Sequence, residues 1–213
     1  MKIAIHALAA LTLLLGAAAD AEPRPDHAES FTVLRNGDPV GSHTIEIRPG
    51  EAGTTVDIAT NVVVKIAMIP VYRFEHRGSE RWRDGRLLAM SSQTNDDGTR
   101  HSLDVRDTGN DVLDVVGDGQ RNSVGGAIVP ASLWNRATVA QTILLNTLDG
   151  RRMAVTVQDL GSEAVMVRGQ ARPARHYSLT GELQRELWYD ESGLLVQVAF
   201  KGRDDSDIRY VLR

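Results

Sequence analysis

The sequence has no cysteine among its 213 residues. The fold is therefore held together without disulfides, although an exported chain would be free to form them. The absence also excludes thiol chemistry and cysteine-ligated zinc, and it removes the residue at which exported lipoproteins carry their lipid. Any catalytic or metal chemistry has to come from other side chains.

An excess of basic charge is also missing. Lysine and arginine number 24 against 28 aspartates and glutamates, so the formal net charge is −4. Lysine occurs only as Lys2, Lys65 and Lys201, and all other basic residues are arginines. Because the two signs are mixed along the chain, there is no basic footprint of the kind that binds nucleic acid. We expect no nucleic-acid partner.

Long apolar runs are absent beyond the N-terminus. Lys2 precedes an apolar run over residues 3–15, and small residues follow, which is the layout of a secretory signal peptide. The run is shorter than the roughly 20 residues of a membrane-spanning helix. The rule of small residues at the cleavage site fits Ala19 or Ala21. We therefore predict a signal peptide over residues 1–21 and a periplasmic or secreted protein whose mature chain has no transmembrane segment.

The remainder of the chain has the length of one domain with a sizeable core. Residues 22–30, EPRPDHAES, have the composition of a flexible lead-in. Apolar residues recur with a period of two from Phe31 onward, as in TTVDIATNVVVKIAM, which is typical of half-buried strands. We expect residues 31–213 to form a single β-rich domain.

Turn signals separate these strands. Asn36-Gly37, Asp84-Gly85 and Asp97-Gly98 stand between alternating segments, and such pairs favour tight hairpins. Strands greatly outnumber helices and there is no βαβ rhythm. The pattern predicts a large curved antiparallel sheet, either a half-barrel or an open barrel.

One segment departs from the period of two. Leu133, Ala137, Ala140 and Leu144 recur at spacings of three and four, which suits an amphipathic helix. A proline precedes this segment and a glycine follows it, as at helix ends. We predict a helical insertion near residues 130–147 that packs on the concave side of the sheet.

One phrase occurs twice. Glu80, Trp82 and Asp84 are spaced as Glu186, Trp188 and Asp190 are, and a glycine turn and a Leu-Leu pair follow each set. The structural interpretation is a strand, a turn begun by the aspartate and a return strand, with the tryptophan covering the end of the hairpin. The functional interpretation is that both tryptophans line one apolar cavity together with Trp134.

Three stretches carry a resemblance: PVYRFEHRGSERWRDGRL, PASLWN and ARHYSLTGELQRELWYDESGLLVQVAF. Together they resemble an uncharacterised family of exported bacterial proteins, a domain of unknown function, over about residues 31–212. The predicted architecture is also similar to periplasmic lipoprotein carriers of the LolA type and to related half-barrel domains, which hold acyl chains or other apolar ligands. This second likeness implies a fold and maps no functional residue.

Catalytic motifs are absent from the sequence. There is no G-x-S-x-G nucleophile elbow, phosphate loop or dinucleotide fingerprint, and no two histidines have a metal-ligand spacing. His76, His101 and His176 would suit zinc if the sheet brought them together. The alternative is separate histidines with local hydrogen bonds. We expect no enzyme activity, no metal and no cofactor.

The sequence favours a non-enzymatic periplasmic protein that holds a lipid or acyl chain between the sheet and the helix. Alternatives are a cell-envelope interaction protein without a small ligand and a hydrolase whose site has no recognisable motif. The ligand-pocket candidates are Met68, Tyr72, Phe74, His76, Trp82, Trp134 and Trp188. Four arginines form a row that is explained by cross-strand ion pairs or by docking to anionic lipid headgroups or an acidic envelope partner. These surface-docking candidates are Arg73, Arg77, Arg81 and Arg83.

Overall fold

A computed structural model describes residues 27–213, which form one sheet of fifteen strands. The strand order is β8-β7-β6-β5-β4-β3-β2-β1-β15-β14-β13-β12-β11-β10-β9. The elements are β1 (His27–Arg35), β2 (Asp38–Gly50), β3 (Gly53–Ile66), β4 (Ile69–Arg83), β5 (Arg86–Asp96), β6 (Thr99–Asp107), β7 (Val112–Gly117), β8 (Gln120–Gly125), β9 (Val129–Pro130), a 3₁₀ helix (Arg136–Ala140), β10 (Ile143–Leu145), β11 (Arg152–Val167), β12 (Gln170–Gly181), β13 (Arg185–Tyr189), β14 (Leu195–Lys201) and β15 (Asp207–Leu212).

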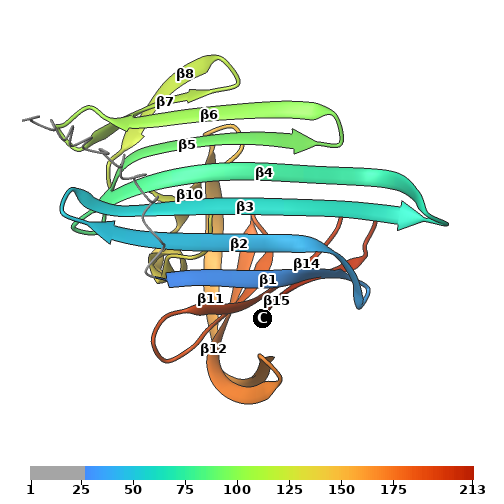
Figure 1. The fold of residues 1–213 in the computed structure, drawn as a ribbon. Coiled ribbons are helices and arrows are strands. Elements are labelled where there is room, and N and C mark those ends of the chain that lie inside the picture. The colour runs from blue at the N-terminus through green and yellow to red at the C-terminus, as the bar shows by residue number, and fades with distance from the viewer. Residues whose placement is uncertain (1–26) are drawn as a thin grey trace, which may run out of the picture.

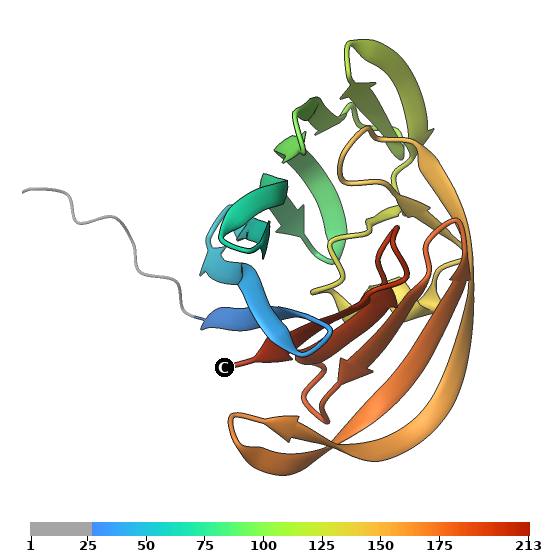
Figure 2. The ribbon, with the colours of Figure 1, turned by 90° about the vertical axis from the view of Figure 1, so that its right-hand side faces the viewer.

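The sheet is open and strongly curved. Its first half, β1–β8, and its second half, β11–β15, are joined where β1 pairs with β15, with Phe31 opposite Leu212. Figure 1 shows β11 and β12 crossing behind the long strands of the first half, and Figure 2 shows the two halves facing each other. All strand pairs are antiparallel except β9 with β10. The predicted open, curved antiparallel sheet is confirmed.

Tight turns between successive strands follow a common rule. Both turn residues have positive φ, a conformation that suits asparagine or aspartate followed by glycine. The three turns predicted from the sequence are of this kind. The turns are Asn36-Gly37, Asp84-Gly85, Asp97-Gly98, Asp118-Gly119 and Arg168-Gly169. Two hairpins differ from these: Ala67 and Met68 occupy the β3–β4 turn with φ of 48° and 71°, and Glu51 and Ala52 in the β2–β3 turn do not have positive φ.

The predicted helix near residues 130–147 was wrong. Residues 27–213 contain no α-helix, and this region holds one 3₁₀ turn over Arg136–Ala140. Asn135 caps that turn by accepting a hydrogen bond from the Ala137 N–H. The β-branched residues that follow have low helix propensity, and Ile143–Leu145 pairs with β11 as a strand. The apolar residues of this region recur every three or four positions because an irregular segment is buried on several sides, and not because it is an α-helix.

Residues 131–149, called here the crossing segment, nevertheless lie between the two halves of the sheet (yellow in Figure 2). On one side Ser92 Oγ donates to the Thr147 carbonyl at 2.5 Å. On the other side Tyr189 Oη donates to the Leu133 carbonyl at 2.6 Å. The crossing segment therefore fills the concave side of the sheet without being helical.

The boundaries of the domain also differ from expectation. His27 lies opposite Ile47 in the β1–β2 ladder, so residues 27–30 of the predicted lead-in belong to the sheet. The predicted signal peptide over residues 1–21 lies outside the described residues. Within residues 27–213 no helix has the length and hydrophobicity needed to cross a bilayer.

Candidate functional site

A cavity of about 350 Å³ lies between the two halves of the sheet. Strands β2, β3 and β4 line one side, β13, β14 and β15 line the other, and the crossing segment contributes the remaining wall. Aliphatic side chains and three aromatic rings form its apolar part. These are Ile58, Phe74, Leu195, Val198, Phe200 and Tyr210.

The polar part of the wall is a row of side chains across four strands. His43 lies opposite Thr60, Thr60 opposite His76, and His76 opposite Thr94. Residues paired in this way share one face of a sheet. We call these four residues the His–Thr row. It places two imidazoles on neighbouring ladders of the same wall.

Each imidazole in the His–Thr row is held by a threonine. His43 Nδ1 lies 2.8 Å from Thr60 Oγ1, and His76 Nδ1 lies 2.7 Å from Thr94 Oγ1. Among residues 27–213, no hydrogen bond engages the Nε2 atom of either ring. Burial lowers the pKa of both rings to about 4, and the neighbouring His76 lowers the pKa of His43 further. Both are therefore neutral at pH 7 and can offer Nε2 to a ligand.

The opposite wall contributes a cation. The Arg185 guanidinium lies 3.8 Å from the centroid of the Phe200 ring, and its Nη1 donates to the Gln184 carbonyl at 2.7 Å. None of the described residues places a carboxylate within salt-bridge distance of it. Burial lowers the pKa of this guanidinium. The cavity thus combines a half-buried charge that lacks a counter-ion with an aromatic surface.

A second buried cluster lies beside the cavity and is packed solid. Trp82 and Trp134 both donate their indole N–H to Glu80 Oε2 at 2.8 Å, and their rings meet edge to face with centroids 5.8 Å apart. Glu80 is 1% exposed, and its Oε1 has no hydrogen-bond partner among the described residues. Burial raises the pKa of this carboxyl. These two tryptophans contact each other at the core, Trp82 buried and Trp134 half-buried, and neither lines the cavity.

The second copy of the repeated phrase lies elsewhere. Trp188 stacks on His176 with centroids 4.1 Å apart, and its indole N–H donates to Glu163. Its neighbour Tyr189 reaches the crossing segment on the inner side, and successive residues of a strand point to opposite faces. Trp188 therefore faces away from Trp82 and Trp134, and the expectation of one cavity lined by all three is not met.

The remaining pocket candidates divide in the same way. Phe74 and His76 line the cavity. Tyr72 instead donates to Asp96 at 2.8 Å, and Met68 is 82% exposed at the tip of the β3–β4 hairpin. Pairing of β4 with β5 ends at Phe74. The alternation in the sequence continues beyond that point to Tyr72, although the strand there no longer belongs to the wall of the cavity. Periodicity alone cannot show where a strand leaves the sheet.

The three histidines considered for zinc do not converge. His101 Nδ1 lies 2.7 Å from Asp118, and His176 Nε2 lies 2.7 Å from Glu186. His76 is the member that belongs to the His–Thr row. Within residues 27–213 no group of three or more histidine, aspartate or glutamate side chains has the arrangement of a metal site.

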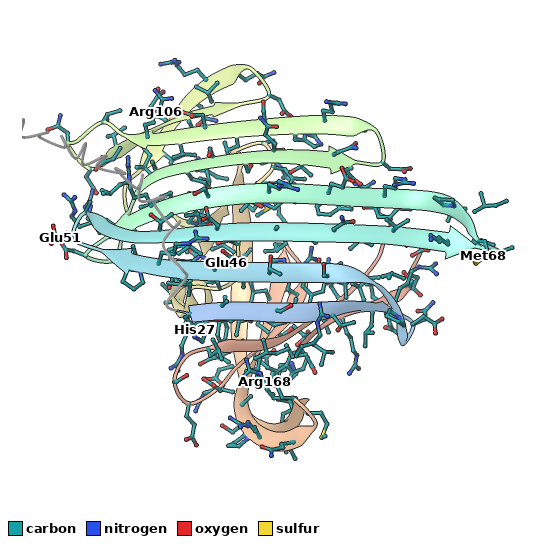
Figure 3. All side chains as sticks on the ribbon, in the orientation of Figure 1. His27, Glu46, Glu51, Met68, Arg106 and Arg168 are labelled. Carbon is teal, nitrogen blue, oxygen red and sulfur yellow. The ribbon has the colours of Figure 1, made fainter. Side chains whose placement is uncertain are left out.

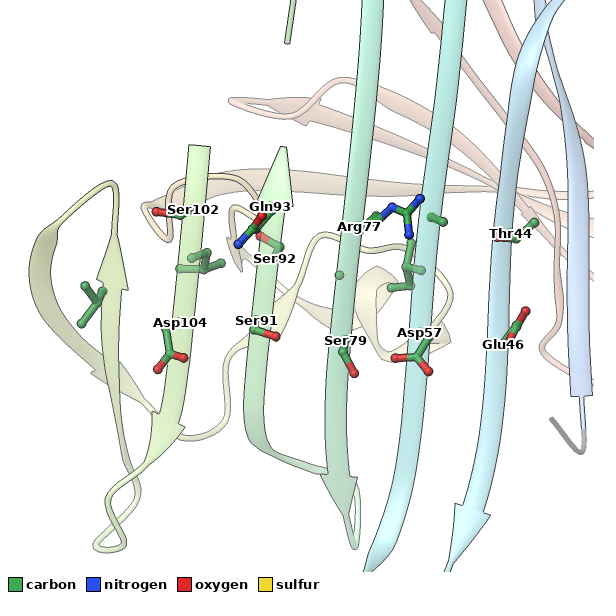
Figure 4. A pocket seen from close by; sticks show the side chains of 15 residues that line it. Thr44, Glu46, Asp57, Arg77, Ser79, Ser91, Ser92, Gln93, Ser102 and Asp104 are labelled. Atoms are coloured by element: carbon green, nitrogen blue, oxygen red, sulfur yellow. The ribbon is translucent and has the colours of Figure 1, made fainter. Parts of the chain in front are cut away.

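A larger hollow of about 690 Å³ lies on the outer face of β2–β6 (Figure 4). It exists because short side chains such as Ser79 and Ser91 line its floor. The acidic residues at one side, Glu46 and Asp57, are both bonded by Arg48. The hollow is open to solvent and mixes polar with apolar side chains, so it lacks the enclosed apolar surface of the cavity between the two halves of the sheet.

The four arginines of the row are exposed on β4. None of them forms an ion pair with an acid within residues 27–213, although Arg83 donates to the Ala52 carbonyl at 2.7 Å. The expected cross-strand ion pairs are therefore not formed. The positive charge of Arg73, Arg77 and Arg81 is left free on the outer surface.

Comparison with known proteins gives one result. No curated protein matches the chain. Residues 31–213 match a protein family described as a domain of unknown function, DUF6134. Because this match spans most of the chain and nearly all of the sheet described above, the protein belongs to the DUF6134 family.

Proposed function

We propose that this protein is a non-enzymatic periplasmic binding protein, and that its cavity holds an amphipathic ligand with an anionic head group and an acyl chain or other apolar body. The observation that supports the proposal most is the position of Arg185. Its half-buried guanidinium has no carboxylate within salt-bridge distance among the described residues, and it lies in a cavity whose other wall carries two neutral imidazoles. The carboxylate in the cavity lining, Glu182, is paired with Arg151 instead.

The charges favour an anion. A cation that is partly removed from water gains most from a counter-ion, and a planar guanidinium matches a carboxylate or phosphate in a bidentate manner. The His–Thr row adds two Nε2 atoms that can donate or accept, depending on the tautomer. A carboxylate near Arg185 would satisfy the charge, and a second polar group would reach His43 or His76.

The apolar residues favour an aliphatic or aromatic body behind that head group. Phe74, Phe200 and Tyr210 present ring surface, and Ile58 and Val198 present aliphatic surface. A cavity of about 350 Å³ lies at the lower end of the range for small-molecule pockets, roughly 300–1,000 Å³. A single-chain fatty acid or a compact acid of similar size suits this volume. The architectural resemblance to LolA-type carriers that we expect from the sequence would imply the same class of apolar ligand.

The test is titration of the protein with oleate, followed by calorimetry and native mass spectrometry. Binding of one oleate per chain is expected, and decylamine should bind far more weakly. Arg185→Gln should weaken oleate binding roughly tenfold or more, because hydrogen bonds to charged groups contribute about 1.5–3 kcal/mol.

Arg209→Gln is the matched control, because Arg209 is exposed and lies next to Tyr210 on the opposite face of β15. It should bind oleate as the wild type does. If wild type and Arg185→Gln bind oleate equally, or if neither binds while both are folded, the proposed function is wrong.

A further inference from the structure

The β3–β4 hairpin extends beyond the rest of the sheet. Pairing between β2 and β3 ends at Gly41 with Val62, and pairing between β4 and β5 ends at Phe74 with Asp96. Residues 63–72, called here the free hairpin, therefore have no neighbouring strand on either side, whereas the backbone of Arg73 directly behind them is hydrogen-bonded to Asp97. Figure 1 shows the tip reaching past the adjacent turns.

The tip of the free hairpin consists of exposed apolar residues. Ile66 and Ile69 face each other across the turn and are 64% and 66% exposed. Met68, at the far end in Figure 3, is 82% exposed, and Val71 is 48% exposed. Scattered single apolar residues are normal on a protein surface, but a contiguous group marks an interaction site.

The turn of the free hairpin has apolar residues in a backbone conformation that favours glycine or asparagine. Both of its residues have positive φ, yet they are Ala67 and Met68. Other tight turns of the same chain meet this requirement with a glycine, as Asn36-Gly37 does. An Asn-Gly pair would suit the backbone better, so the side chains at this tip serve a purpose other than forming the turn.

The edges of the free hairpin are protected against strand addition. A register shift interrupts the ladder between Val64 and Lys65, and Pro70 removes a backbone donor from the other strand. Bulges, lysine and proline are the features by which proteins keep an edge strand from pairing with another chain. The partner of this hairpin therefore contacts its side chains, and a second copy joined through the backbone is disfavoured.

We propose that the free hairpin docks the protein onto a lipid bilayer by inserting its apolar tip into the membrane surface. A membrane surface suits an apolar end that is followed along the hairpin by the basic residues Lys65 and Arg73, because an interfacial anchor buries its apolar residues and keeps its cations at the headgroups. At about 3.3 Å per residue, Lys65 lies about 8 Å behind the turn. Interfacial insertion reaches roughly 5–10 Å, which places this ammonium at the headgroups.

Charge along the hairpin fits the same orientation. Arg73 is exposed and forms no ion pair within residues 27–213, so it adds positive charge on the approach to the membrane. The adjacent turns carry Asp38 and Asp97, and they are set back from the tip. Contact with an anionic surface is thus confined to the tip. This inference depends on the hairpin alone and stands whether or not the cavity binds oleate.

The test is flotation with vesicles of phosphatidylethanolamine and phosphatidylglycerol, using the protein as the cell processes it. Its N-terminus is read by mass spectrometry, since the apolar run over residues 3–15 would itself bind lipid. The variant replaces Ala67→Asn together with Met68→Gly, which keeps the turn and removes its apolar side chain. It should partition into vesicles roughly tenfold less than wild type. Met166→Ser removes another exposed methionine, on β11, and should partition as wild type does.

Two results would overturn the proposal. One is a wild-type protein that stays with the soluble fraction, and the other is equal flotation of the wild type and the turn variant. Analytical ultracentrifugation tests the remaining possibility, that the tip contacts a second copy of the chain. A wild type that ignores vesicles but dimerises, with the dimer lost in the turn variant, would assign the tip to a second copy of the chain.

Discussion

Trp82 and Trp134 donate to the same oxygen atom, Oε2 of Glu80, each at 2.8 Å. Trp82 belongs to β4 and Trp134 to the crossing segment, so one buried carboxyl ties the crossing segment to the first half of the sheet. Burial raises the pKa of Glu80, and hydrogen bonds to its oxygens oppose that shift. The cluster is a structural joint beside the cavity.

The joint predicts different outcomes for two substitutions of Glu80. Glu80→Ala leaves two indole N–H groups without an acceptor, that of Trp82 buried and that of Trp134 part-buried, which should cost about 2–4 kcal/mol in the free energy of unfolding. Glu80→Gln retains an acceptor oxygen and should cost much less. Urea unfolding of both variants at pH 7 measures the difference, and equal losses would show that the indoles do not depend on this oxygen.

The pH dependence of stability in the wild type and in Glu80→Gln supplies a second test. The folded-state pKa of Glu80 lies above 4.5, so the unfolded chain releases a proton that the folded chain retains. The wild-type free energy of unfolding should fall as pH rises from 4.5 through the folded pKa. Glu80→Gln removes that contribution. The free energy of unfolding of the variant, measured relative to that of the wild type, should therefore be higher at pH 8 than at pH 4.5. An unchanged difference would mean that Glu80 is ionised in the fold.

Much of this fold follows from local signals in the sequence. A period of two and pairs such as Asn36-Gly37 and Asp84-Gly85 specify strands and turns through interactions within a few residues, and the sheet was predicted from them. The helix near residues 130–147 failed because a period of three to four residues also arises when an irregular segment is buried on several sides. Leu133 there adopts a φ of 68°, which no helix allows.

The candidate site depended on information that the sequence pattern does not contain. His43 and His76 stand thirty-three positions apart, and they share a wall only because β2, β3 and β4 pair in one register. Arg185 comes from the other half of the sheet. A one-residue slip in register would move each side chain to the opposite face. The sequence identified Phe74 and His76 because they alternate on one strand. It could not identify their neighbours on other strands, because those depend on the register of pairing.

The turn of the free hairpin leads to a prediction about stability. Ala67 and Met68 both have positive φ, and a left-handed conformation costs residues other than glycine roughly 1–2 kcal/mol each. Ala67→Asn with Met68→Gly should therefore raise the free energy of unfolding by about 1–3 kcal/mol while it reduces vesicle binding. Thermal and urea unfolding measure the gain. A loss of stability would show that the exposed side chains support the fold.

The close approach of the crossing segment to Gly117 leads to another prediction about stability. A Cβ atom at this position would lie 1.8 Å from the Asp149 carbonyl oxygen, whereas one at Gly125 would meet nothing within 4 Å. Gly117→Ala must push the crossing segment away from β7, so it should destabilise the protein by about 2–4 kcal/mol. Gly125→Ala is the matched control on the next strand, and it should change stability by less than about 1 kcal/mol. Similar effects of the two changes would contradict the close approach.

The His–Thr row predicts a loss of stability in acid. The folded-state pKa of His43 and of His76 is about 4, below the ordinary value of 6.5. Below pH 6.5 the unfolded chain takes up protons that the folded chain refuses, so the free energy of unfolding should fall between pH 6.5 and pH 4. The full effect is about 3 kcal/mol per ring. Glu29 acts in the opposite direction, because burial raises its pKa to about 7 and its contribution falls as pH rises from 4.5 to 7.

Substitution separates these two contributions. His43→Asn with His76→Asn keeps a side-chain amide near each threonine hydroxyl and removes both titrating rings. With both rings removed, the free energy of unfolding should no longer fall in acid because of them, and the opposite slope of Glu29, together with that of Glu80, should emerge as the pH rises from 4.5 to 7. If the double variant follows the wild-type profile of urea unfolding against pH instead, the imidazoles are not held neutral by the cavity wall, and their role as neutral ligand-binding groups falls with them.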